Sequence, residues 1–164
     1  MVDKLEVGDL APEFSLVGSD GLIYALNQYK GYRALVIFFT SDLSSHAMEL
    51  EGYLKELSDT FHKRGVAFIA IHPCEEPQMK ELSWKSLYDP TQAITKRYGA
   101  QVLPHFFLFD SHRMLSYSGR ALDETREHLK EALSEILDLQ PITMSETDPV
   151  GTHIEEIDSA AVLV

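Results

Sequence analysis

The stretch from Ala34 to Ala47, ALVIFFTSDLSSHA, joins two different patterns of apolar residues. It opens with a continuous apolar run, which is typical of a strand buried on both faces of a sheet. An apolar helical stripe follows, made of Leu50, Tyr53, Leu54, Leu57 and Phe61. We therefore predict a central strand at Ala34–Phe39 that leads into a helix, with Ser44 or Ser45 as its N-cap and Gly65 at its end.

The same alternation of strand and helix continues along the chain. Val66–Ile71 is a second continuous apolar run, and its short links favour a right-handed βαβ unit. A helix is predicted at Thr91–Tyr98, with Asp89 as N-cap followed by Pro90. A short helix also fits Glu76–Leu82. These segments predict two parallel strands that are joined and followed by helices.

The last predicted elements are a hairpin and a helix. Phe106–Phe109 is an apolar strand, and Met114–Tyr117 returns as its antiparallel partner. The final helix has one apolar face, made of Leu129, Ala132, Leu133, Ile136 and Leu137. The order β-α-β-α-β-β-α behind an N-terminal extension predicts an α/β thioredoxin-like fold, with a central mixed β-sheet flanked by helices.

The length of 164 residues fits one domain. We place this domain at residues 1–139 and a C-terminal tail at residues 140–164, where Pro141, Pro149 and Gly151 interrupt any regular element. The tail ends in the apolar segment Ala161–Val164. That segment either adds to a sheet edge, in this chain or in a partner, or stays without order.

Charge and composition exclude several classes of function. The formal net charge is -12, and such an acidic surface repels nucleic acid and anionic lipid. Cys74 is the single cysteine, so an intramolecular disulfide is impossible. Neither a signal peptide nor a run long enough to span a membrane is visible. We expect a cytoplasmic protein without a cofactor, and the sequence leaves a homodimer open.

Four motifs, in this order, resemble AhpC/TSA-type redoxins, which belong to the peroxiredoxin and thioredoxin-like superfamily. They are VGDLAPEFSL at 7–16, DGLIYALNQYKGYRALVIFF at 20–39, KRGVAFIAI at 63–71 and LYDPTQAITKRYGAQVLPHFFLFD at 87–110. The likeness covers roughly Val7–Asp138. It implies a thiol-dependent antioxidant oxidoreductase whose reactive cysteine lies where the central strand meets its helix, because a helix N-terminus stabilises a thiolate.

The family cysteine is absent from this chain. The most similar redoxins read Thr-Ser-Asn-His-Cys-Pro-Tyr at the junction, and this alignment places Ser44 at the cysteine. Those relatives also carry a later Gly-Cys pair, and Thr152 stands at its cysteine. Aligned with peroxiredoxins proper, the reactive position falls on Ala47. A serine hydroxyl cannot replace a thiolate, so the resemblance implies a degenerate member that is redox-inactive and has a binding or regulatory role.

The binding site that this hypothesis implies is the groove beside position 44. In the family, a proline before the third strand is cis and faces the active stretch, and Leu103-Pro104 matches it. We expect the groove to bind a protein or a peptide. Around Ser44, its predicted residues are Thr40, Ser41, Asp42, Ser45, His46, Leu103 and Pro104.

Three alternatives remain open. Cys74 follows the second strand, so it is a candidate displaced thiol for a single-cysteine peroxidase, although Glu75 and Glu76 disfavour a thiolate there. A metal-binding site is a second alternative, with ligands His46, His72, His105 and Cys74. An engineered Cys→Ser exchange is a third, but it would not explain the other departures at Asp42, Leu43, Ser45, His46 and Thr152. A Ser-His-Asp relay is disfavoured by the two-residue spacings.

Overall fold

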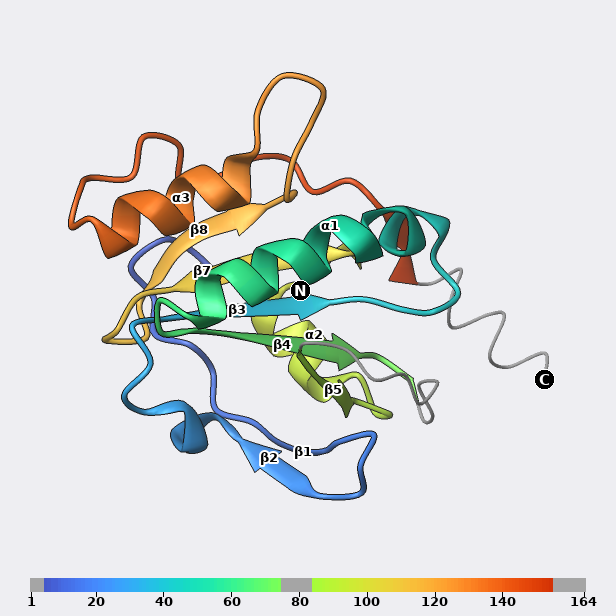
Figure 1. Cartoon of the computed structure of the whole chain (residues 1–164). Coiled ribbons are helices and arrows are strands. Elements are labelled where there is room, and N and C mark those ends of the chain that lie inside the picture. Colours follow the sequence, from blue (N-terminus) through green and yellow to red (C-terminus); the bar gives the residue numbers. More distant parts are fainter. Residues whose placement is uncertain (1–4, 75–83, 155–164) are drawn as a thin grey trace.

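The computed structural model describes residues 5–74 and 84–154. A mixed five-stranded sheet in the order β5-β4-β3-β7-β8 forms its centre (Figure 1). The strands are β3 (Ala34–Phe39), β4 (Val66–His72), β5 (Lys85–Tyr88), β7 (His105–Phe109) and β8 (Leu115–Gly119). β3, β4 and β5 run parallel, whereas β7 and β8 are antiparallel to their neighbours. The predicted central strand, its parallel partner and the hairpin are confirmed.

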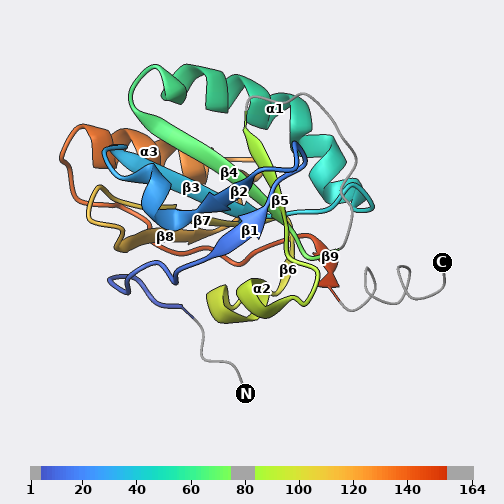
Figure 2. The same cartoon turned by 90° about the horizontal axis from the view of Figure 1, so that it is seen from below.

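Helices cover both faces of this sheet (Figure 2). α1 (Ser45–His62) and α3 (His128–Leu137) lie on one face, and α2 (Ala93–Tyr98) lies on the other. Successive residues of β3 point to opposite sides, so Val36 and Phe38 pack in the cluster with α1 and α3, whereas Leu35 and Ile37 pack in the cluster with α2. Every residue of β3 is buried, which explains its continuous apolar run.

A small hairpin borders the sheet at β5. β1 (Ser15–Val17) pairs antiparallel with β2 (Ile23–Ala25), and the 3-10 helix η1 (Leu26–Tyr29) follows. The N–H group of Ser19 donates to the carbonyl oxygen of Ser86, which ties the turn of the hairpin to β5. The sequence analysis predicted neither the hairpin nor β5, because each is short and has no continuous apolar run.

The predicted start of the second helix is wrong by two residues. α2 begins at Ala93, and Gln92 before it has a left-handed backbone with φ of 63°. The Asp89 carboxylate still serves this helix start, because it accepts the N–H groups of Thr95 at 2.7 Å and Ile94 at 3.4 Å. The short helix predicted at 76–82 lies outside the described residues.

Residues 140–154, which the sequence analysis assigned to a tail, pack on the domain. Thr147 donates its N–H group to the carbonyl oxygen of Ser118 in β8. The strand β9 (Thr152–His153) then pairs antiparallel with β6 (Val102–Leu103), which corrects the expectation that no regular element forms there. The apolar segment 161–164 lies outside the described residues. Within the described ranges, no helix has the length and apolar character needed to cross a membrane.

Candidate functional site

Ser44 lies where β3 gives way to α1 and is completely buried. Its hydroxyl oxygen accepts the N–H group of Ala47 at 3.2 Å, so Ser44 is the N-cap of α1. This contact satisfies one of the N–H groups that have no partner within the first helical turn. Ser45 is exposed, so the choice that the sequence left between Ser44 and Ser45 is resolved in favour of Ser44.

The Ser44 hydroxyl takes part in two more hydrogen bonds, which also fix where the protons lie. It donates to the carbonyl oxygen of Leu103 at 2.9 Å, which uses its single proton. The hydroxyl of Thr152, also 2.9 Å away, must therefore be the donor in their contact. His46 Nδ1, 3.3 Å from the Thr152 oxygen, then donates in turn. Ser44 thus donates one hydrogen bond and accepts two, and its oxygen has no capacity left.

The loop before β7 supplies the second wall of the site. The peptide bond between Leu103 and Pro104 is cis, and both residues are buried. Thr152 pairs with Leu103 in the β6–β9 ladder, so β9 covers the backbone edge of this loop. Gly151 approaches so closely that an added Cβ atom would lie 2.2 Å from the Leu103 carbonyl oxygen. Part of the predicted groove is therefore occupied by the chain itself.

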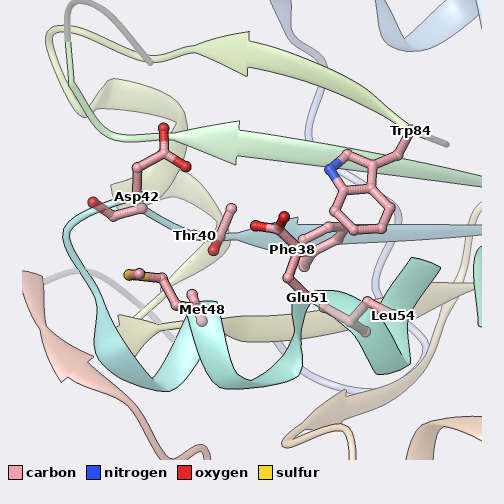
Figure 3. A pocket seen from close by; sticks show the side chains of 9 residues that line it. Phe38, Thr40, Asp42, Met48, Glu51, Leu54 and Trp84 are labelled. Carbon is pink, nitrogen blue, oxygen red and sulfur yellow. The ribbon is translucent and has the colours of Figure 1, made fainter. Parts of the chain in front are cut away.

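A pocket opens beside the N-terminal turns of α1 (Figure 3). Thr40 and Asp42 line it from the end of β3, Met48 and Glu51 line it from α1, and Trp84 closes it from the segment before β5. The Trp84 ring meets the ring of Phe38 edge-on, with a centroid distance of 5.4 Å. Next to this pocket, the side chain of Ser41 accepts the N–H group of Leu43 and shapes the turn. The site thus combines a closed hydroxyl network with an adjacent open pocket.

Cys74 lies outside the hydroxyl network. It follows β4, is partly exposed, and donates its backbone N–H group to the carbonyl oxygen of His72. The amide of Gln92 donates to the neighbouring Pro73 carbonyl oxygen and holds this turn in place. Cys74 therefore shares the sheet edge at which β3 ends, whereas the Ser44 hydroxyl bonds to Leu103, Thr152 and Ala47.

The proposed metal ligands do not form a cluster. Among residues 5–74 and 84–154, no three His, Cys, Asp or Glu side chains are close enough to hold a metal ion. His105 Nδ1 accepts the N–H group of Gln101 at 3.2 Å, and its ring stacks on Phe107. His46 is exposed and contacts Thr152. The structure thus gives no support to the metal-site alternative.

Comparison with known proteins places these features in a family. The family model for Redoxin matches residues 6–135. This chain belongs to the Redoxin family. It is 26% identical to the thiol-disulfide oxidoreductase ResA of Bacillus thuringiensis over 141 residues, which cover 82% of this chain and 80% of the relative. The redoxin resemblance seen in the sequence is confirmed, and it connects the chain with thiol-dependent oxidoreductases.

Solved structures confirm the thioredoxin-like fold of this redoxin. An uncharacterized conserved protein from Geobacillus kaustophilus is similar with a TM-score of 0.84 and 27% identity, over 93% of each chain. The 2-Cys peroxiredoxin of Plasmodium vivax is similar with a TM-score of 0.67 and 19% identity, over 80% of this chain and 82% of its own.

Sequence reasoning missed two parts of this site: the pocket residues Met48, Glu51 and Trp84, and the close approach of Gly151 to the cis-proline loop. Thr152 was noted only as the residue that aligns with the later cysteine of the relatives. Its contact with Ser44 joins residues that are 108 positions apart, and no local pattern reports such a contact. The alignment of both positions with cysteines was the one available signal that they meet.

Proposed function

We propose that this redoxin is a redox-inactive binding protein. The observation that carries the proposal is the environment of Ser44, which stands at the family cysteine. Its oxygen is buried, donates to Leu103 and accepts from Ala47 and Thr152, so it is engaged as a structural group. A hydroxyl is a poor nucleophile towards a peroxide or a disulfide.

An extended protein segment is the ligand that this groove suits best. β6 has an edge beside the cis-proline, and that edge already pairs with an extended segment, β9. Backbone pairing at an exposed strand edge is a common way to bind peptides. The acidic surface argues against a nucleic-acid ligand, because like charges repel. We place this binding activity in the cytoplasm, as expected for a chain with a single cysteine.

Peroxide consumption and disulfide reduction test the loss of redox function. Wild-type protein, with thioredoxin or a small thiol as reductant, is expected to show only the background rate. The Cys74→Ala variant is expected to show the same rate. The Ser44→Cys variant, with a thiol at the helix N-terminus, is expected to react with peroxide faster than wild type.

The same assay separates the proposal from the displaced-thiol alternative. A wild-type rate well above background that disappears in Cys74→Ala would mean that the chemistry has moved to Cys74. Intact-mass measurement after peroxide treatment detects the added oxygen, and comparison with Cys74→Ala separates oxidation of Cys74 from oxidation of the methionines, which also gain oxygen.

A further inference from the structure

We propose that Gly151–His153 is an intramolecular ligand of the groove, and that its sequence defines the partner. This partner is an extended protein segment in which glycine precedes a residue with a hydroxyl group. It binds by displacing the chain's own segment. This inference rests on the proposed strand-binding function. It adds the sequence that the groove recognises, a glycine followed by a hydroxyl residue, and it names Gly151–His153 as the segment that fills the groove.

The backbone of the occupant provides the first argument. Val102 pairs with His153 and Leu103 pairs with Thr152, in antiparallel register. This two-stranded sheet is separate from the central sheet, so β9 is the only strand that pairs with β6 in the described chain. Backbone pairing of this kind is independent of side chains and is open to any extended segment.

The requirement for glycine provides the second argument. A Cβ atom at position 151 would lie 2.2 Å from the oxygen and 2.5 Å from the carbon of the Leu103 carbonyl group, and 2.9 Å from the Pro104 nitrogen. All three atoms belong to the backbone of the cis-proline loop, which cannot move aside as a flexible side chain can. The groove therefore excludes every residue larger than glycine at this position.

The requirement for a hydroxyl provides the third argument. Because Ser44 donates its own proton to Leu103, the Thr152 hydroxyl donates to the buried Ser44 oxygen, and its oxygen is left as an acceptor for His46 Nδ1. A purely apolar residue at position 152 would remove a hydrogen-bond donor from Ser44 and an acceptor from His46. Serine and threonine satisfy both groups, so the groove selects a hydroxyl residue directly after the glycine.

The fourth argument concerns residues 140–150, the arm that leads to β9, because this arm has its own anchor on the central sheet and does not depend on β9 for it. Thr147 fixes the arm, since its hydroxyl contacts the Tyr117 hydroxyl at 2.6 Å and accepts the Arg120 N–H group at 3.0 Å. Val150 is exposed, and Ile154, the last residue that the structure describes, packs on the core cluster. A partner with an apolar residue two positions after its hydroxyl residue would replace Ile154 as well.

A labelled peptide with the sequence of residues 148–154, DPVGTHI, tests the proposal on the full chain. Binding is measured by fluorescence anisotropy to wild type, to Gly151→Ala and to Gly52→Ala. The first variant prevents docking of the internal segment. The second is the matched control, because a Cβ atom at Gly52 meets no atom within 4 Å. A control peptide carries alanine in place of its glycine.

Gly151→Ala is expected to bind the peptide at least about tenfold more tightly than wild type and Gly52→Ala do, because a tethered segment competes at a high effective concentration. The alanine peptide is expected to bind none of the three proteins. Equal affinity of the peptide for all three proteins would mean that the internal segment does not compete for the groove. This result would overturn the inference but would leave the proposed binding of extended segments standing. No binding to Gly151→Ala, with its fold confirmed by circular dichroism, would overturn both proposals.

Thr152→Val provides a second variant for the case in which Gly151→Ala does not fold. It keeps the backbone pairing of β9 but loses the hydrogen bonds to Ser44 and His46, so the peptide is again expected to bind more tightly than to wild type. A peptide with valine in place of threonine is expected to lose that advantage. Equal binding of the two peptides would overturn the requirement for a hydroxyl.

Discussion

A single oxygen atom, that of Ser44, connects three segments that are distant in sequence. It caps α1 at Ala47, holds the cis-proline loop through Leu103, and receives the hydroxyl of Thr152. A sulfur atom at this position would react with peroxides and disulfides, whereas the oxygen atom acts as a structural junction. We therefore expect this position to contribute to stability rather than to redox chemistry.

Ser44→Ala is expected to destabilise the protein by roughly 2–4 kcal/mol. Loss of an N-cap costs about 1 kcal/mol. The Leu103 carbonyl oxygen would also be left buried without its partner, which adds about 1–3 kcal/mol. Urea unfolding measures the free energy of unfolding, and Ser45→Ala is the control because Ser45 is exposed. Equal losses in the two variants would contradict the assigned role of Ser44.

Asp123 gives the protein a dependence on acid pH. Its carboxylate accepts a hydrogen bond from His128 Nε2 at 2.6 Å, and also from the N–H groups of Thr125 and Arg126. These donors, His128 foremost, hold the pKa of Asp123 well below its usual value. A lowered folded-state pKa stabilises the protein above the unfolded-state pKa of about 4, and this contribution is lost as pH falls towards the folded-state pKa.

Asp123→Asn is therefore expected to lower the melting temperature near neutral pH. The difference from wild type is expected to shrink steadily below about pH 4, because the Asp123 carboxylate of the unfolded chain becomes protonated there while that of the folded protein stays ionised. Calorimetric melting across this range is the measurement. Glu124→Gln is the control, because this substitution removes the same charge from an exposed side chain. A difference that stays constant with pH would argue against the carboxylate as the cause.

At the scale of elements, the arm after α3 depends on one glycine of β8. Gly119 has φ of 140°, and a Cβ atom there would lie 2.2 Å from the Thr147 hydroxyl oxygen and 2.4 Å from its carbonyl oxygen. The arm therefore packs directly on the backbone of the last strand. This close approach fixes Thr147, and through it the part of the chain that leads to β9.

Gly119→Ala is expected to destabilise the protein by roughly 1–3 kcal/mol, because both the backbone conformation and the contact with Thr147 are disturbed. The Thr147 N–H group, which donates to Ser118, is expected to exchange faster with solvent. Urea unfolding and amide hydrogen exchange measure these effects. Gly52→Ala is the control, because the added Cβ atom meets no neighbouring atom. We expect this variant neither to lose stability nor to exchange the Thr147 N–H group faster.

The elements differ in how far the sequence predicts them. β3 and β4 were predicted because continuous apolar runs report burial on both faces, and α1 was predicted because its apolar stripe reports a single buried face. β9 was not predicted, because its position depends on Leu103, on Ser44 and on the space left for a glycine. The same reason applies to the site, whose parts come together only through contacts between distant residues.

At the scale of the whole molecule, the contact between Ser44 and Thr152 closes a very long loop. The two oxygen atoms are 2.9 Å apart although the residues are 108 positions apart in sequence. Two sulfur atoms in a disulfide are about 2.05 Å apart, and C–S bonds are longer than C–O bonds. The structure therefore places two side chains where a pair of cysteines would be within bonding reach.

A Ser44→Cys, Thr152→Cys variant in a Cys74→Ala background is expected to form a disulfide on oxidation. Closing a loop of this length stabilises a protein by roughly 2–4 kcal/mol, so the oxidised form should unfold at a higher temperature than the reduced form. Intact mass detects the loss of two hydrogen atoms. A Ser45→Cys, Thr152→Cys pair is the control, since Ser45 points to solvent. A double variant that stays fully reduced would contradict the geometry.

The order in which the ribosome makes the chain determines when β9 can pair with β6. Ser44 and the loop at Leu103 are synthesised before Gly151. The residues of β6 are thus made before the segment that later covers their edge. A partner segment that is present before β9 has been made does not compete with β9. A partner segment that arrives later must displace β9 from β6. We therefore expect newly made and mature protein to differ in access to the proposed binding edge, without any chemical modification.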